Sequence, residues 1–134
     1  MSPFSDSGCL CAAAALLAIV TGGSAEKTEC LRALDDATSA TVKALWVFEH
    51  AGDVTAARNV LAAANTARTR LETQNVSAFC DPSRSEELIY LNHLTLGFTG
   101  WIAARARRPS REYDLASIIR RARTHRARGR SRLQ

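Results

Sequence analysis

Gly52 and Asp53 separate two stretches with helical periodicity, and this short connection constrains the fold more than any other part of the sequence. The first stretch is marked at three- and four-residue spacing by Leu31, Leu34, Thr38, Thr41, Leu45 and Phe48. Val42 and Trp46 widen this apolar stripe. The second is marked in the same way by Val54, Ala57, Leu61, Ala64, Arg68 and Leu71. Such spacing is typical of helices with one buried face. Glycine can end a helix and aspartate can cap the next one, so we predict two antiparallel helices joined by a tight turn.

This hairpin makes a prediction about two cysteines that flank it, Cys30 and Cys80. Both helices are about 30 Å long at a rise of about 1.5 Å per residue. The second helix therefore returns the chain to the start of the first, where we expect Cys80 to approach Cys30. A disulfide bond closing that loop would stabilise the fold by about 4 kcal/mol on the chain-entropy model. The alternative is two unrelated buried thiols.

Residues 1–25 have the pattern of an export signal. Residues 9–20 form an unbroken apolar run, and small residues such as Ser24 and Ala25 follow it. The run is too short for a membrane span, which needs about 20 apolar residues. The segment before the run has no Lys or Arg, although export signals usually carry one. The alternative is a buried N-terminal helix of a cytoplasmic protein.

Cleavage after Ala25 would remove Cys9 and Cys11 and leave Cys30 and Cys80 as one possible pair. An even number of cysteines in a small exported domain favours a disulfide bond. We therefore predict a periplasmic or secreted protein with no integral membrane span once the signal is removed. If the chain stays in the cytoplasm, the same cysteines are expected to be ordinary core residues.

The remaining sequence indicates an all-α fold, because it lacks runs of β-branched residues and Asn-Gly or Asp-Gly hairpin turns. Asp81 is expected to cap a third helix that has Pro82 in its first turn. This helix is the most apolar and should be central, with Leu88, Leu91, Leu94, Leu96, Phe98, Trp101 and Ile102 on more than one face. Gly97 and Gly100 are expected to let another helix approach closely. Ser110 is expected to cap a fourth helix.

These elements predict a small domain of three to four helices, built on the antiparallel hairpin. The predicted organisation is a signal peptide at residues 1–25, a helical domain at 26–108, and an Arg-rich helix and tail at 109–134.

Positive charge is concentrated in the C-terminal segment. Residues 103–134 contain eleven arginines against Glu112 and Asp114, whereas the whole chain has a net charge of only +5. The candidate basic patch consists of Arg120, Arg121, Arg123, Arg126, Arg128, Arg130 and Arg132. Such segments bind nucleic acid, anionic lipid surfaces or acidic proteins. A solvated, partly disordered tail is the alternative, because no aromatic residue lies between these arginines to stack on bases.

No catalytic, metal-binding or cofactor-binding motif is present in the sequence. It has no His-Glu-x-x-His, no phosphate-binding glycine loop and no Gly-x-Ser-x-Gly, and its histidines, His50, His93 and His125, are far apart. Glu86 and Glu87 are adjacent, so we expect them to point to different sides of a helix. The prediction is therefore a protein without catalytic residues, metal or cofactor. An unrecognised enzyme would show a pocket with His50 or His93 beside a carboxylate.

Two local patterns resemble known families. Residues 49–58, followed by Leu61 and Ala64, are similar to the turn of a tetratricopeptide repeat. That resemblance covers one hairpin, whereas repeat arrays need about three copies and no second copy is present. The segment therefore predicts a tight helical hairpin and no array.

The second resemblance concerns the layout of the chain. A signal is followed by a cysteine at the start of a helix, in residues 28–31, and by Phe-Cys-Asp-Pro at the start of an apolar helix, in residues 79–82. This is similar to small periplasmic all-helical proteins with one disulfide bond. They include immunity proteins that protect bacteria from secreted toxins, and the HdeA-type acid-stress chaperones. The resemblance covers about residues 27–101 and implies an exported domain that binds another protein.

The prediction from the sequence is thus an exported, non-catalytic protein-binding module, similar to an immunity protein. The alternative is a cytoplasmic protein that binds nucleic acid through its Arg-rich end.

Overall fold

The computed structural model describes the backbone of residues 3–107 and 114–134, and the side chains of residues 25–106 and 114–134. Within these residues there is no strand. The elements are α1 (Pro3–Ala51), α2 (Val54–Thr73), a short 3-10 helix η1 (Ala78–Cys80), α3 (Asp81–Arg107) and α4 (Leu115–Ser131). The all-α prediction is confirmed for this part of the chain.

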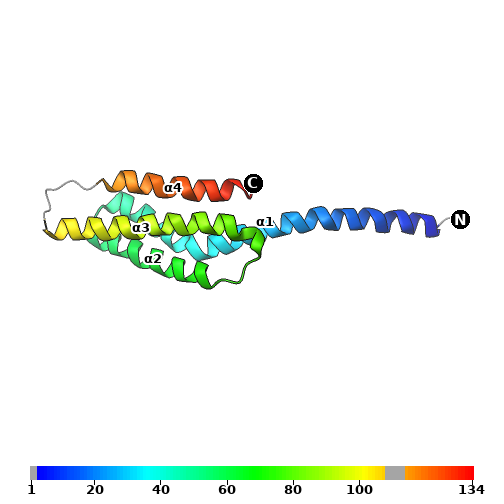
Figure 1. The fold of residues 1–134 in the computed structure, drawn as a ribbon, viewed down its shortest axis with the longest axis horizontal. Coiled ribbons are helices and arrows are strands. Elements are labelled where there is room, and N and C mark those ends of the chain that lie inside the picture. The colour runs from blue at the N-terminus through cyan, green and yellow to red at the C-terminus, as the bar shows by residue number, and fades with distance from the viewer. Residues whose placement is uncertain (1–2, 108–113) are drawn as a thin grey trace.

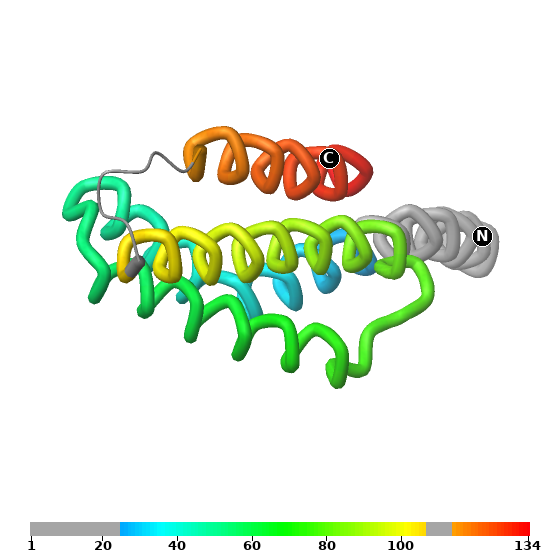
Figure 2. Tube along the Cα trace, turned by 60° about the vertical axis from the view of Figure 1, so that its left-hand side comes forward, coloured from blue at the N-terminus to red at the C-terminus, as the bar shows by residue number. Residues whose placement is uncertain are grey.

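The four helices form an up-and-down bundle (Figure 1). α2 runs back along α1, α3 packs on α2, and α4 packs on α3. Figure 2 shows α3 between α4 and α2, with the C-terminal half of α1 behind it. The predicted central position of the third helix is therefore correct, and α3 carries the largest buried side chains, including Tyr90 and Phe98.

The turn between α1 and α2 has the predicted chemistry. Gly52 has φ +67°, the left-handed conformation that glycine adopts without steric cost, and its amide donates to the carbonyl of Phe48 over 2.7 Å. The Asp53 carboxylate accepts from the amide of Ala56 over 2.8 Å and so caps α2. The antiparallel hairpin follows from this local geometry.

Cys30 and Cys80 form the predicted disulfide bond. Their Cα atoms lie 5.4 Å apart, and the bridge joins positions separated by 50 residues. Both cysteines are buried among Leu34, Leu71 and the other core residues. The bond ties α1 to η1 at the point where the chain enters α3.

Two helix starts differ from the predictions, and a third lies in part outside the described residues. α1 begins at Pro3 and not near Cys30, and Gly22 and Gly23 lie inside this helix without ending it. Asp81 is not a cap: η1 leads directly into α3, so Asp81 has helical dihedral angles and pairs with Arg84 at 2.9 Å. Ser110 lies outside the described residues, and the cap of α4 is Asp114, which accepts from the Ser117 amide over 3.1 Å.

Some predicted core residues are exposed. Leu96 in α3 is 72% exposed and Trp46 in α1 is 60% exposed, with Val42 also accessible beside Trp46. Periodicity predicts a buried stripe, but the width of that stripe depends on how many helices pack on it. No helix of the described residues is both long and apolar enough to cross a membrane. The signal peptide at residues 1–25 stays a prediction.

Candidate binding surface

α4 approaches α3 closely at two glycines. A Cβ atom on Gly97 of α3 would lie 2.6 Å from Cγ2 of Ile118, so a side chain at this position would force Ile118 or α4 to shift. At the other end of the interface the Ser83 hydroxyl donates to the carbonyl of Gly129 over 2.7 Å, and a Cβ on Gly129 would collide with Glu86. The predicted close approach at Gly97 is confirmed, whereas Gly129 was not identified from the sequence.

A buried carboxylate on α3 holds the Arg-rich helix. Glu87 is only 1% exposed, and it accepts from Nε of Arg126 over 3.1 Å and from Nε of Arg130 over 3.2 Å. Arg130 also donates to Asp35 of α1 over 2.7 Å. Burial alone would lower the pKa of Arg130, but Glu87 and Asp35 raise it above its ordinary value. Arg130 therefore stays charged and links α4 to both α1 and α3.

A second ion pair closes the opposite end of the α1–α4 contact. Arg123 donates through both terminal nitrogens to the two carboxylate oxygens of Glu49, one of them at 3.0 Å. This two-pronged geometry suits the planar guanidinium group. The hydrogen bond to Glu49 is the main reason that the pKa of Arg123 is raised.

The candidate basic patch therefore divides into two groups. Arg123, Arg126 and Arg130 hold α4 in the bundle through carboxylates of α1 and α3. Arg120, Arg121, Arg128 and Arg132 are exposed. None of these four makes an ion pair with a carboxylate in the described part of the chain. Arg120, Arg121 and Arg128 lie on α4, and Arg132 follows its last residue. This second group is the exposed and unpaired part of the patch within the described residues.

An exposed tryptophan marks a shallow groove between α1 and α4. We call this the Trp46 groove; its volume is about 420 Å³, and it is lined by Asp35, Ser39, Val42, Lys43, Trp46 and Arg126. The Trp46 ring lies 3.9 Å from the ring of His50, whose Nδ1 is 2.8 Å from the Trp46 carbonyl oxygen. The neighbouring histidine restricts the indole, so Trp46 is presented to solvent in a defined position.

A larger groove lies towards the loop end of the bundle, and we call it the Phe48 groove. It has a volume of about 740 Å³. Its floor comes from α1, α3 and α4 and consists of Phe48, Trp101, Leu115 and Ile119. Arg105, Arg120, Arg123 and Glu49 bring charge to its lining. Neither this groove nor the Trp46 groove is lined by His50 or His93.

No family model matches this chain, and no curated protein or solved structure is similar to it. The resemblance to immunity proteins and HdeA-type chaperones therefore stays a prediction from local patterns.

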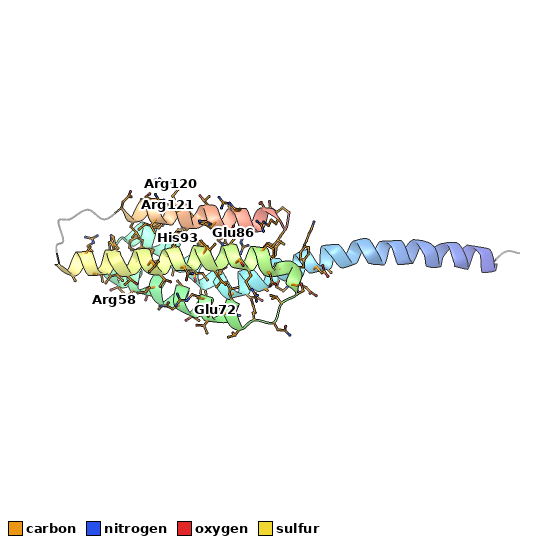
Figure 3. All side chains as sticks on the ribbon, in the orientation of Figure 1. Arg58, Glu72, Glu86, His93, Arg120 and Arg121 are labelled. Carbon is orange, nitrogen blue, oxygen red and sulfur yellow. A yellow bond between two sulfur atoms is a disulfide. The ribbon has the colours of Figure 1, made fainter. Side chains whose placement is uncertain are left out.

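Two histidines far apart in sequence are neighbours in the structure. The rings of His93 and His125 stack with centroids 5.2 Å apart, and Nδ1 of His125 lies 2.8 Å from a carboxylate oxygen of Glu86. Figure 3 labels His93 and Glu86 on α3. Glu86 contacts His125, and Glu87 accepts from Arg126. Both partners belong to α4, so the two adjacent carboxylates face the same neighbouring helix. Within the described residues no group of three or more His, Cys, Asp or Glu is placed to bind a metal ion.

Acidification is expected to destabilise the protein through His93. Burial lowers the pKa of His93 below its ordinary value of 6.5, and the charges of His125 and Arg121 lower it further. The unfolded chain therefore binds a proton at His93 more readily than the folded chain does. The contribution of His93 to the free energy of unfolding is present above pH 6.5 and is lost as the pH falls through the lower folded pKa.

Urea denaturation of wild type and His93→Gln between pH 7.5 and about 4.5 measures this effect. The variant should lose less stability on acidification than the wild type. His50→Gln is the matched control, because His50 is on α1 and outside the stacked pair. An identical pH dependence for wild type and His93→Gln would contradict the prediction.

Proposed function

We propose that this chain is an exported, non-catalytic helical module that binds a protein partner through the Trp46 groove. The observation that carries the proposal is the 60% exposure of Trp46 beside a groove flanked by charged side chains. A large indole in water is costly, and Trp46 is more exposed than Phe79, which is 40% exposed, whereas Phe98 and Trp101 are buried.

The composition of the groove supports a protein partner. Tryptophan and arginine are the residues most enriched in the energetically dominant centres of protein interfaces, and such centres have a polar rim. Here Val42 and Trp46 supply the apolar centre and Lys43 supplies positive charge at its edge. Arg126 also lines the groove, but its charge is already paired with Glu87. We infer that the partner presents an apolar pocket next to acidic side chains.

The disulfide bond supports the exported part of the proposal. Cys30 and Cys80 are bonded, and structural disulfides persist in oxidising compartments such as the periplasm. In an immunity-like form of this function, the partner is a toxin secreted by the same or a sibling strain. Cells without this chain would then become sensitive to that toxin.

Trp46→Ala is expected to weaken partner binding by about 2 kcal/mol or more, roughly thirtyfold, because a central interface tryptophan is removed. The measurement is calorimetric titration with a partner first isolated by crosslinking in the extracytoplasmic fraction of the native host. Leu96→Ala is the matched control, since Leu96 is a large apolar residue that is more exposed than Trp46 but lies on α3. In the immunity-like form, Trp46→Ala should also fail to restore toxin resistance, whereas Leu96→Ala should restore it.

Equal affinities for wild type and Trp46→Ala would overturn the proposed surface. A cell that lacks the chain and remains resistant to its own and its sibling toxins would overturn the immunity-like role. Both variants are expected to fold, because the side chains of Trp46 and Leu96 are largely exposed to water. A change in affinity therefore reports on binding and not on stability.

Nucleic-acid binding is the second candidate function, and four exposed arginines on α4 and at its C-terminal end favour it. Arg120, Arg121, Arg128 and Arg132 present positive charge without a pairing carboxylate in the described part of the chain. Duplex DNA affinity that falls steeply with salt, and that disappears when all four are replaced by glutamine, would establish this alternative. In that case the Trp46→Ala change should leave DNA affinity unchanged.

A further inference from the structure

We propose that the Phe48 groove is a binding site for a small amphipathic organic anion. The acidic head group, such as a carboxylate, binds Arg105 and Arg120, and an aromatic or aliphatic body lies on the apolar floor. This site is distinct from the Trp46 groove, because the two grooves share no lining residue. The inference therefore goes beyond the proposed protein-binding function.

The floor of the groove is rigid and apolar. The ring of Phe48 meets Phe98 edge-on at 4.8 Å between centroids, and it meets Trp101 edge-on at 5.1 Å. Leu115 and Ile119 of α4 complete the floor and are themselves almost fully buried. Three helices thus hold the floor in place, and an apolar ligand would find a surface that needs no rearrangement.

The lining of the groove carries more positive charge than the carboxylates of the described residues neutralise. Three arginines line the groove, and Glu49 is the one carboxylate among its described lining residues. Glu49 is already engaged by both terminal nitrogens of Arg123. Among the described residues Arg105 and Arg120 therefore pair with no carboxylate, and an anion would complement their charge.

The Arg105 guanidinium is held in place by an aromatic ring and a carbonyl oxygen, neither of which neutralises its charge. Its guanidinium carbon lies 4.4 Å from the centroid of the Trp101 ring, and one terminal nitrogen makes a long contact of 3.5 Å with the Gly52 carbonyl oxygen. Stacking on the indole leaves most N–H groups of the guanidinium available in its plane. A planar carboxylate can then accept two parallel hydrogen bonds.

The size of the groove favours a small molecule over a protein segment. Its volume of about 740 Å³ lies within the range of about 300–1,000 Å³ that is typical of pockets for compounds of drug size. A ligand with one acidic group and an apolar body would match both the floor and the arginines. An acidic side chain of a partner protein is the other possible occupant, and the experiment below distinguishes it.

Anilinonaphthalene sulfonate is a suitable probe, because it combines one anionic group with an apolar body and fluoresces when shielded from water. We expect one molecule to bind the folded, oxidised full-length chain with a micromolar Kd. N-phenylnaphthylamine has the same aromatic body without the charge and should bind at least about tenfold more weakly, since it lacks charge-assisted hydrogen bonds. Dodecanoate should displace the probe, whereas dodecanol should do so only at much higher concentration.

Arg120→Ala and Arg121→Ala form a matched pair of variants. Both arginines are exposed residues of α4 and neighbours in sequence (Figure 3), but only Arg120 lines the groove. Arg120→Ala should weaken probe binding about tenfold, as expected for the loss of a charge-assisted hydrogen bond. Arg121→Ala should leave it unchanged, and Ala127→Trp should abolish it by filling the groove.

Equal losses for Arg120→Ala and Arg121→Ala would mean that the probe follows net charge, and the proposed site would be wrong. Equal affinity for the charged and uncharged probes would likewise overturn it. If no small anion binds, while Arg120→Ala weakens binding of the protein partner, the groove belongs to the protein interface and the inference fails.

Discussion

Replacing both Cys30 and Cys80 with serine is expected to lower the free energy of unfolding by about 4 kcal/mol. The disulfide bond spans 50 residues, and a cross-link over a loop of that length removes much of the entropy of the unfolded chain. Small domains are typically stable by only about 5–15 kcal/mol, so the loss would be a large share of the total. Urea denaturation of the oxidised protein and of the double variant measures it.

The reduced wild type provides the control. Reductant should destabilise the wild type by a similar amount and leave the double variant unaffected, because only the wild type contains the bond. If the free energies of unfolding of the oxidised wild type and the double variant differ by less than about 1 kcal/mol, the disulfide bond adds little stability, for instance because the unfolded state is already compact. Intact mass of the protein from the native host's extracytoplasmic fraction would test export at the same time. We expect a chain that begins at Glu26 and gains about two hydrogens on reduction.

Glu87→Gln is expected to lower the free energy of unfolding by about 3 kcal/mol. Removing one member of a buried ion pair usually costs about 3–5 kcal/mol, since the remaining charge is left uncompensated. The lower value applies here because Arg130 keeps Asp35, and the Arg126 side chain is 27% exposed and can reach water. Thermal or urea denaturation gives the total change. Asp81→Asn is the matched control, because it breaks an exposed pair with Arg84 and should cost less than about 1 kcal/mol.

Hydrogen exchange locates the effect of Glu87→Gln. If Glu87 holds α4 on the bundle, the amides of α4 should exchange faster in the variant while those of α1 and α2 keep their protection. A uniform loss of protection in all four helices would contradict this, and so would a stability change as small as that of Asp81→Asn. The result decides whether the Arg-rich helix docks chiefly through charge or through the close contacts at Gly97 and Gly129.

The hairpin and its disulfide bond could be predicted from the sequence because their causes are local. Gly52 and Asp53 determine the turn through the conformations that they favour, and two helices of similar length then bring Cys30 and Cys80 together. The all-α fold follows from the lack of strand signals in the sequence, and the central position of the third helix follows from apolar residues on more than one of its faces. Gly97 was also predictable as a point of close approach, although its partner Ile118 was not.

The exposed positions of Trp46 and Leu96 were not predictable in this way. Both lie on apolar stripes, and a stripe says nothing about which helix will cover its edges. The cap of the described helix α4 was also not identified from the sequence, because aspartate and serine cap helices equally well and only the folded chain shows the Asp114 carboxylate accepting from the Ser117 amide.

The sequence by itself determined that α4 is strongly basic, but only the tertiary structure decided which of its arginines are available. Arg123, Arg126 and Arg130 are neutralised by Glu49, Glu87 and Asp35, which lie between 39 and 95 residues away in the chain. The contact between His93 and His125 likewise exists only because α3 and α4 pack together. Charge is a property of each residue, whereas ion pairing depends on which distant side chains the packing of the helices brings within hydrogen-bond distance.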